Sequence, residues 1–426
     1  MRHRKTAAVL GWGVVLLVFG VAGPLFARGP RWRRVDVGQA TNPMQAVYTY
    51  DSLHIWASTY FGDVLYTRDG GFNWSSFTLG NVCCPGLDGG STAKSFFFFD
   101  TLNGWIAGQA NNGPPPAGSF RLHTSDGGNS WAMQLDTGTN WGGQILFLNK
   151  RKGFDLIGHE CNFRDSFLVT NDSGKSWQIK TAGIPACALG RFHFVDSLNG
   201  WAISYRPAPN NNAIDLLRTR NGGNSWAALS VSIPVCAGAK IWFQDTLNGW
   251  MWHCNPLLSN VARFSRTSDG GITWDSLSGF SSDYWFYGFE AVDSAHIWLA
   301  GSNVGFATVQ FSSNGGRSWM EQMPGVGDPL WGLDVFDSLH AYAIGANGYV
   351  YVYSPQLIGD LNLDWVLSSA DIILMLNYTF LGMPTSVPPA DMDFNADCSV
   401  TAADVVLLLN KTFLGDPSLQ WGCAVS

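Results

Sequence analysis

Short apolar runs separated by polar turns fill the chain from residue 32 to about residue 354. Runs such as 95–99 (SFFFF) and 200–203 (GWAI) are four or five residues long, which suits a β-strand better than a helix. Turns rich in Asp, Asn and Gly separate these runs, as they do between the strands of antiparallel sheets. The pattern therefore predicts a mainly β structure built from many short strands.

Two turn motifs recur in this region. The first reads Thr/Ser-x-Asp/Asn-x-Gly-x-x-Trp and occurs six times, from Thr67 to Trp74, Thr124 to Trp131, Thr170 to Trp177, Thr219 to Trp226, Thr267 to Trp274 and Ser312 to Trp319. The second reads Asp-Ser/Thr-Leu-Asn-Gly-Trp at Asp100, Asp196 and Asp245, with looser copies starting at Asp51, Asn149, Asp293 and Asp337. Its seven copies are 44 to 49 residues apart. This period suits four strands per unit, the blade of a β-propeller, so seven copies predict seven blades.

The residue types of the first turn fit a tight connection between strands. An Asp or Asn side chain is expected to cap the backbone amides two and three residues on, and glycines supply positive φ. The Trp is expected to pack in the sheet, and the segment after it to form the outer strand of a blade. The seventh unit lacks this segment. Residues 32–37 (WRRVDV) have the same pattern and are predicted to complete the seventh blade, which would close the ring.

Composition narrows the function classes. Of the 426 residues, 13% are charged and 14% aromatic, which is typical of a β-rich fold with little helical surface. The formal net charge is −7, and Lys and Arg cluster only at the N-terminus. Because nucleic-acid binding needs clustered cations, no nucleic-acid partner is expected.

The N-terminus predicts export. Basic residues 2–5 precede an uncharged apolar stretch from about residue 7 to residue 27. Residues 1–27 are therefore interpreted as a signal peptide cut near Ala27, or alternatively as a retained N-terminal anchor. Either reading places the rest of the chain outside the cytoplasm, secreted or attached to the cell surface.

The eight cysteines of an exported chain favour disulfides over metal or catalytic sites. The preferred pairs are Cys236 with Cys254, Cys161 with Cys187 and Cys398 with Cys423, while Cys83 and Cys84 have no assigned partner. Sequence does not fix this connectivity. Zinc binding at His159 with Cys161, or at His253 with Cys254, is disfavoured because the spacing matches no zinc finger.

Two similar segments, 33 residues apart, replace the blade pattern near the C-terminus. Each places oxygen-bearing side chains at positions 1, 3, 5, 9 and 12 of a loop that opens an apolar helix, and a backbone carbonyl at position 7. Hard Ca²⁺ ions prefer such ligands. Two Ca²⁺ sites are predicted: Asp360, Asn362, Asp364, Val366, Ser368 and Asp371 in one, and Asp393, Asn395, Asp397, Ser399, Thr401 and Asp404 in the other.

These duplicated loops resemble a type I dockerin over about residues 357–415, within a predicted small all-α calcium-binding domain at 356–426. The resemblance implies a cohesin-like or other surface scaffold as partner. It places the partner contacts at loop positions 10 and 11, which are Ser369, Ala370, Ala402 and Ala403. Position 6 departs from the family pattern, since Trp365 and Cys398 stand where Gly normally makes the turn. A calcium-stapled structural cap without a partner is the alternative.

The turns of residues 32–354 resemble the Asp-box of sialidases, of xyloglucan-cleaving glycosidases and of sortilin-type receptors. The combination of both motifs is most similar to photosystem II assembly factor (Ycf48/Hcf136-like) propellers. The resemblance implies a seven-bladed propeller, assigned to residues 28–355, in which the Asp-box is a structural turn.

A glycoside hydrolase needs two carboxylates that flank one glycosidic bond. The chain has three glutamates, and most of its aspartates outside the calcium loops belong to the repeated turns. Four acidic residues outside the repeats are the catalytic candidates: Asp88, Glu160, Asp165 and Asp283. The chain has no Arg-Ile-Pro segment of the sialidase type, and the resembled xyloglucan enzymes use two propellers where this chain has one.

Aromatic segments at 141–143 and 284–287 suggest a glycan or protein ligand on a propeller face, which the loops 111–118 and 206–213 would help to shape. The sequence thus favours an exported, non-catalytic binding or assembly propeller attached to a partner by its dockerin-like domain. The competing hypothesis is a polysaccharide-degrading glycoside hydrolase delivered to a scaffold by that domain.

Overall fold

The computed structural model describes residues 31–38, 42–81, 91–110, 119–136, 142–157, 166–183, 189–205, 213–234, 239–255, 261–279, 284–323, 327–354, 360–361, 367–384, 392–395, 397 and 399–414. These residues fall into two compact units, which divide between Tyr353 and Ser354. The first unit contains the strands and the second contains both α-helices.

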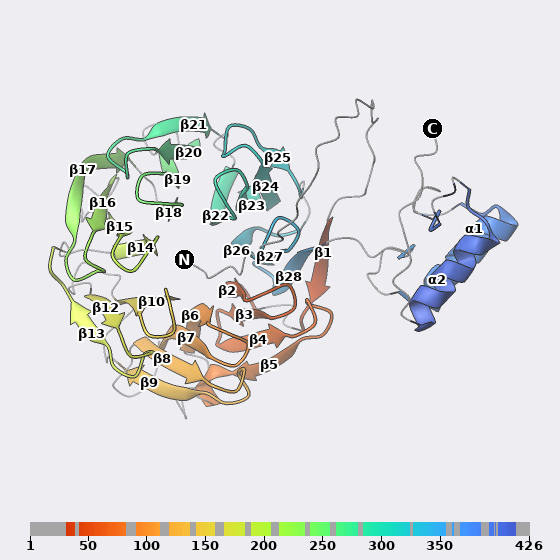
Figure 1. Ribbon diagram of the computed structural model, residues 1–426, viewed down its shortest axis with the longest axis horizontal. Coiled ribbons are helices and arrows are strands. Elements are labelled where there is room, and N and C mark those ends of the chain that lie inside the picture. Colours follow the sequence, from red (N-terminus) through yellow and green to blue (C-terminus); the bar gives the residue numbers. More distant parts are fainter. Residues whose placement is uncertain are drawn as a thin grey trace, which may run out of the picture. The chain divides into compact units, whose positions relative to one another are not determined.

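Seven four-stranded sheets form a ring (Figure 1), as the seven motif copies predict. Blades 1 to 3 are β2 (Met44–Thr49), β3 (Ile55–Thr59), β4 (Asp63–Thr67) and β5 (Ser75–Thr78); β6 (Ser91–Phe98), β7 (Gly104–Ala110), β8 (Ser119–Thr124) and β9 (Ala132–Asp136); and β10 (Gly142–Phe147), β11 (Gly153–Ile157), β12 (Ser166–Thr170) and β13 (Gln178–Lys180). A short 3-10 helix, Leu79–Asn81, follows β5.

Blades 4 to 6 are β14 (Leu189–Phe194), β15 (Gly200–Tyr205), β16 (Ala213–Thr219) and β17 (Ala227–Pro234); β18 (Lys240–Phe243), β19 (Gly249–Asn255), β20 (Val261–Thr267) and β21 (Asp275–Gly279); and β22 (Tyr284–Ala291), β23 (Ile297–Asn303), β24 (Phe306–Ser312) and β25 (Met320–Glu321). Blade 7 combines β26 (Leu330–Val335), β27 (Ala341–Gly345) and β28 (Tyr349–Ser354) with β1 (Arg31–Asp36).

The seventh blade confirms the predicted closure of the ring. Its strand order is β1-β28-β27-β26, so the first strand of the chain is its outer strand. Trp32 packs against Tyr353 of the same blade at 5.3 Å and against Trp298 of blade 6 at 6.3 Å between ring centroids. Closure thus joins strands separated by about 300 residues in the sequence and pairs an edge that would otherwise be open.

The hydrophobic core of the ring lies between the blades. The described residues form seven buried clusters in this unit, and each cluster combines side chains from two neighbouring blades. The Trp that ends the first motif belongs to these joints. Trp131 of blade 2 lies edge-on to Trp56 of blade 1 at 5.7 Å, and Trp319 of blade 6 lies edge-on to Phe264 of blade 5 at 5.0 Å. The prediction that this Trp packs in the sheet is refined, because it also packs against the preceding blade.

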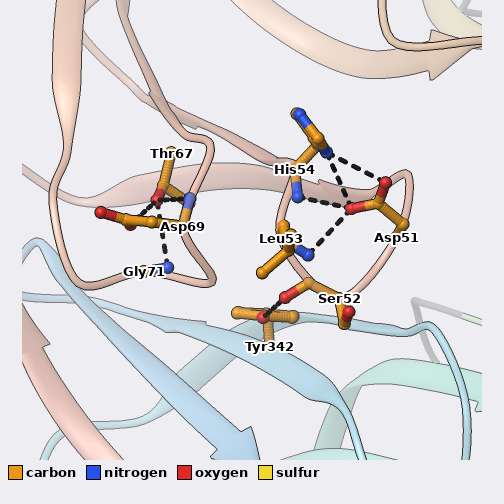
Figure 2. A network of polar contacts seen from close by, with 8 residues as sticks. All are labelled: Asp51, Ser52, Leu53, His54, Thr67, Asp69, Gly71 and Tyr342. Carbon is orange, nitrogen blue, oxygen red and sulfur yellow. Dashed lines mark hydrogen bonds and ion pairs between the residues drawn. The ribbon is translucent and has the colours of Figure 1, made fainter. Parts of the chain in front are cut away.

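The hydrogen bonds of the two turn motifs differ. Figure 2 shows one copy of each, with Asp51 bonded to Leu53 and His54, and Thr67 bonded to Asp69 and Gly71. In the second motif, Asp51 Oδ1 accepts from the amides two and three residues on, at 2.8 and 2.7 Å. In the first motif, Asp69 Oδ1 instead accepts from the amides of Phe72 and Asn73, three and four residues on. The sequence-based expectation for the first motif is therefore wrong by one residue. Thr67 Oγ1 accepts a hydrogen bond from the amide of Gly71. Gly70 and Gly71 both have positive φ, so the backbone turns tightly around the Asp69 carboxylate.

The two motifs meet across the joints between blades. Trp201 Nε1 of blade 4 donates to the carbonyl of Gly270 in the first-motif turn of blade 5, at 2.9 Å. Trp250 Nε1 of blade 5 donates in the same way to Gly315 of blade 6, at 3.1 Å. Buried indole N–H groups need such acceptors. At these two joints the glycine turn of one blade satisfies the tryptophan of the blade before it, which gives both motifs a structural role there.

Side-chain size is complementary where each inner strand pairs with the second strand. In blades 2 to 5 a Phe faces a Gly: Phe98 with Gly104, Phe147 with Gly153, Phe194 with Gly200 and Phe243 with Gly249. In blades 1, 6 and 7 the pairs are Thr49 with Ile55, Ala291 with Ile297 and Val335 with Ala341. A Cβ added at any of the four glycines would lie 2.3 to 2.7 Å from the ring of the facing Phe. The Gly of the second motif is therefore required by the Phe that precedes it.

The second unit contains helices α1 (Ser369–Leu381) and α2 (Ala402–Leu414). Their buried faces form one small core around Met375, Phe394 and Leu408. Ser368 and Asp371 cap the start of α1 reciprocally, and Gly382 ends it in the left-handed conformation. Neither described α-helix is long and apolar enough to cross a bilayer.

The size complementarity predicts a coupled mutant pair. Gly200→Ala should reduce the free energy of unfolding by about 1–3 kcal/mol, because the new methyl group overlaps the Phe194 ring. Adding Phe194→Leu should recover part of this loss. Chemical denaturation of the two single variants and the double variant measures the coupling energy. Strictly additive losses would show that the two side chains do not compete for this space.

The first motif predicts an acid-dependent stability. Hydrogen bonds from the Ser176 hydroxyl and amide lower the pKa of Asp172 to about 2. Because this pKa lies below the ordinary value of 3.8, the ionised carboxylate stabilises the fold above about pH 4, and the contribution disappears as pH falls toward 2. Asp172→Asn should fold normally, since Asn221 and Asn314 occupy the same place in blades 4 and 6. Its melting temperature should fall less than that of the unchanged protein between pH 4 and pH 2.

Candidate functional site

A central cavity (the channel) is lined by residues of the seven inner strands β2, β6, β10, β14, β18, β22 and β26, which surround the centre of the ring in Figure 1. Its cavity has a volume of about 370 Å³, which is within the range of ligand pockets. Every blade contributes side chains to its wall. The channel is therefore the place where residues from all seven repeats come together.

A β-bulge recurs near the start of the inner strands. The pairing register with the second strand slips by one residue in six blades, around Gln45, Lys94, Gly143, Arg191, Tyr287 and Trp331. A bulged residue is left out of the hydrogen-bond ladder between the two strands, so its side chain points in a different direction from that of a regularly paired residue. Gln45, Lys94, Arg191 and Trp331 of this set line the channel. Four blades thus present a different side chain at one mouth of the channel, opposite the end with the Asp turns.

One side of this mouth is basic. Lys94, Arg191 and Lys240 line the channel from blades 2, 4 and 5. Burial and the nearby charge of Arg191 lower the pKa of Lys94. The same two causes lower the pKa of Lys240 to about 7, although Glu290 opposes the shift. The guanidinium of Arg191 therefore acts on both lysines, which marks the three as one cluster of like charges.

Exposed aromatic side chains lie at or near some of the bulges. Trp331 and Tyr287, at the bulges of blades 7 and 6, are 40% and 45% exposed. In blade 1 the neighbouring Tyr60 ring lies 5.5 Å from Lys94 Nζ, and its exposed edge adjoins Phe61. Of these aromatic residues, Trp331 belongs to the lining of the channel, together with Lys94, Arg191 and Lys240.

Other polar side chains of the channel wall tie the blades together. Gln144 donates to the carbonyl of Phe192 and accepts from its amide, at 2.9 and 3.0 Å, joining blades 3 and 4. Ser95 Oγ accepts from the amide of Ile145 at 2.8 Å, joining blades 2 and 3. The Asp334 carboxylate accepts from the Thr49 hydroxyl at 2.7 Å and closes the ring between blades 7 and 1. These groups are part of the scaffold that fixes the mouth.

The four carboxylates proposed as catalytic, Asp88, Glu160, Asp165 and Asp283, lie outside the described residues. So do the cysteines of the proposed disulfides except Cys254, whose backbone lies in β19 but whose side chain is not described. The described carboxylates that line the channel are Glu290 and Asp334. The Asp334 carboxylate holds Thr49 at the joint between blades 7 and 1.

The predicted calcium loops place buried carboxylates at equivalent positions. Asp360 and Asp371 of the first loop and Asp393 and Asp404 of the second are at most 1% exposed. Asp371 Oδ1 accepts from the amide of Leu361 and Asp404 Oδ1 from the amide of Phe394, both at 2.8 Å. Position 12 of each loop is thus bonded to position 2, and the two halves share this geometry.

The remaining second-loop residues form a local network. Asp393 Oδ1 accepts from the amide of Asp397 at 3.1 Å, and Asn395 Nδ2 donates to the Asp397 carboxylate at 2.8 Å. In the first loop Asn362, Asp364 and Val366 lie outside the described residues. Within the described part of the chain, no group of three or more His, Cys, Asp or Glu side chains is positioned to hold a metal ion.

The charge balance of this unit nevertheless fits a bound cation. Residues 354–426 contain eight aspartates and a single basic residue, Lys411. Buried carboxylates are costly unless a cation or several hydrogen bonds compensate them. With one lysine available for four buried carboxylates, oxygen-preferring divalent cations are the fitting counter-ions. Bound Ca²⁺ would supply positive charge and hold the ends of each loop together.

The fold and the site define the chain as a seven-bladed β-propeller followed by a helical unit with two acidic loops. No family model and no curated protein matches the sequence. Among solved structures, "YCF48 bound to D1 peptide" has a TM-score of 0.57 at 20% identity and covers 76% of this chain and 96% of its own. YCF48 from Cyanidioschyzon merolae has a TM-score of 0.59 at 18% identity and covers 77% and 100%.

A GH74 xyloglucanase from Xanthomonas campestris is similar with a TM-score of 0.53 at 13% identity. The match covers 75% of this chain and 53% of the xyloglucanase, so the chain corresponds to about half of that enzyme. At these identities the likeness establishes the propeller fold. The ligand has to be argued from the residues of this chain.

The acidic loops predict calcium-dependent stability. In calorimetry, Ca²⁺ at one hundred times its dissociation constant should stabilise the helical unit by about 2.7 kcal/mol per site. The double variant Asp360→Ala, Asp393→Ala should lose this response. Ser399→Ala is the matched control, because position 7 is expected to offer its backbone carbonyl and not its side chain. Identical melting of the unchanged protein with calcium and with chelator would exclude these sites.

Proposed function

We propose that this chain is an exported, non-catalytic binding or assembly protein. Its propeller holds a protein partner, and its C-terminal unit attaches the complex to a scaffold outside the cytoplasm. The observation that carries the first half is the mouth of the channel, where side chains that differ between blades gather on a scaffold fixed by contacts between the blades. One structural neighbour is a propeller with a bound peptide, which supports a protein ligand.

The C-terminal unit is proposed to be a calcium-dependent docking domain for a cohesin-like scaffold. The four residues assigned to partner contact, Ser369, Ala370, Ala402 and Ala403, are all exposed in the first turns of α1 and α2. Exposed apolar residues continue from them at equivalent places on both helices, namely Ile373 with Val406 and Phe380 with Phe413. Unpaired apolar surface of this kind suits a protein interface.

The second candidate is a glycoside hydrolase acting on a polysaccharide. It is supported by the fold-level likeness to a xyloglucanase and by the exposed rings of Trp285 and Trp331, since aromatic faces can stack on sugars. Release of reducing sugar from soluble polysaccharides is the direct test. Activity that disappears on replacing Asp88, Glu160, Asp165 or Asp283, without loss of folding, would replace the binding proposal by this one.

Affinity capture tests the docking proposal. The full chain, in calcium and then in chelator, is compared with the double variant Ala370→Arg, Ala403→Arg against the native extracellular and envelope fraction. A scaffold held in calcium, released by chelator and lost in the variant is the expected result, because the large charged side chains obstruct both helix faces.

Two results would contradict docking. Capture that persists in chelator and in the variant would make the helical unit a structural cap. A calcium-dependent partner that ignores both substitutions would place the contact elsewhere on that unit.

A further inference from the structure

We propose that Lys240, on the wall of the channel, is a nucleophilic amine that captures small uncharged aldehydes or ketones as a reversible imine. Lys240 begins the inner strand of blade 5 and lines the cavity of about 370 Å³. Its side chain is partly exposed, so a solute in the cavity can reach it. The inference concerns a ligand other than the protein partner and the scaffold proposed above, and it depends on neither.

The amine of Lys240 is not held by an acceptor. Within the described part of the chain, no hydrogen bond or ion pair joins it to another group. Lys94, the other lysine of the wall, differs in this respect, because its Nζ lies 3.4 Å from Gln45 Oε1 and 5.5 Å from the Tyr60 ring. A hydrogen bond to an acceptor favours the charged form of a lysine. Lys240 lacks this stabilisation, so its lone pair is available for reaction.

The surroundings of Lys240 favour the neutral amine. Burial and the charge of Arg191 lower its pKa from the ordinary value of 10.5 to about 7, although Glu290 opposes the shift. Burial is the larger cause, so the shift does not require Arg191 to be unpaired. At pH 7 about half of the Lys240 amines are neutral, against about one in three thousand at a pKa of 10.5. Desolvation and a neighbouring cation are recognised ways of activating a lysine nucleophile.

The cavity suits a small ligand without net charge. The charged or titratable side chains that line it with Lys240 are of both signs, namely Lys94 of β6, Arg191 and His193 of β14, Glu290 of β22 and Asp334 of β26. His193 is neutral at pH 7, because burial lowers its pKa to about 3. The two carboxylates therefore offset most of the positive charge of the wall. A volume of about 370 Å³ lies near the lower end of the range for ligand pockets.

The reaction balances without a further reagent. The lone pair of Nζ attacks the carbonyl carbon, and the new C–N bond gives a carbinolamine. The former carbonyl oxygen then leaves with both amine protons as one water molecule, so a C=N bond remains. Water reverses both steps and restores the lysine. No electrons are transferred, so neither an oxidant nor a cofactor is needed.

Reductive trapping tests this inference with the full chain. The probe is glycolaldehyde with cyanoborohydride, which reduces the imine to a stable amine, and peptide mapping by mass spectrometry measures the rate at each lysine. At pH 7 Lys240 should react about tenfold or more faster than the exposed Lys150 and Lys175, because its larger neutral fraction outweighs the weaker nucleophilicity of a less basic amine. The ratio of these rates should fall as pH rises from about 7 to about 10.

Variants and unfolding provide the controls. Lys240→Met should lose the fast adduct, whereas Lys175→Met, at an exposed turn of blade 3, should keep it. In guanidinium chloride the rate at Lys240 should drop to that of the exposed lysines, because the folded environment is the source of its reactivity. Equal rates at Lys240 and the exposed lysines of the folded protein, a ratio that does not change with pH, or a fast adduct at Lys94 instead would each overturn the inference.

Discussion

The structure depends on closing a ring of seven twisted sheets with no blade left unpaired. Every joint must satisfy buried polar groups and fill the gap between neighbouring sheets, and the last joint must do so between the two ends of a long chain. The pairing of β1 with β28 and the bonds from Thr49 to Asp334 close it. At two further joints the indole of one blade reaches the glycine turn of the next, as Trp201 reaches Gly270 and Trp250 reaches Gly315. The motifs repeat because the same joint has to be made around the ring.

Because of this constraint, the two ends of the ring differ in how far their side chains can vary from blade to blade. At the end with the Asp turns, the side chains are bound to neighbouring backbone, so the residue types recur from blade to blade. At the bulge near the other end, the ladder makes no demand on the extra residue, and the chain places Gln45, Lys94, Gly143, Tyr287 and Trp331 there. Variation at a position that packing does not dictate is where a repeat protein can specialise.

Structural features that repeat from blade to blade could be predicted from the sequence, whereas contacts that occur only once could not. The number of blades, the outer strands and the closure of the ring could be predicted from the repeated motifs. The complementarity of Phe and Gly can be recognised in the sequence only when the pairing of the strands is known. The channel cluster has no signature, because Lys94, Arg191 and Lys240 are 97 and 49 residues apart and meet only through ring geometry. The fully buried ion pair of Arg121 in β8 with Asp155 in β11 was missed for the same reason. Its residues lie in different blades, and neither belongs to a motif.

The two proposed attachments would respond to different variables, and this follows from their charges. The helical unit has eight aspartates and one basic residue, so the proposed docking would depend on divalent cations. The described wall of the channel carries both signs, with Lys94, Arg191 and Lys240 beside Glu290 and Asp334, so a ligand held there would not need calcium. Chelator would therefore release the proposed scaffold while leaving a propeller ligand bound. A protein that bridges two partners through chemically independent sites can lose either one without losing the other.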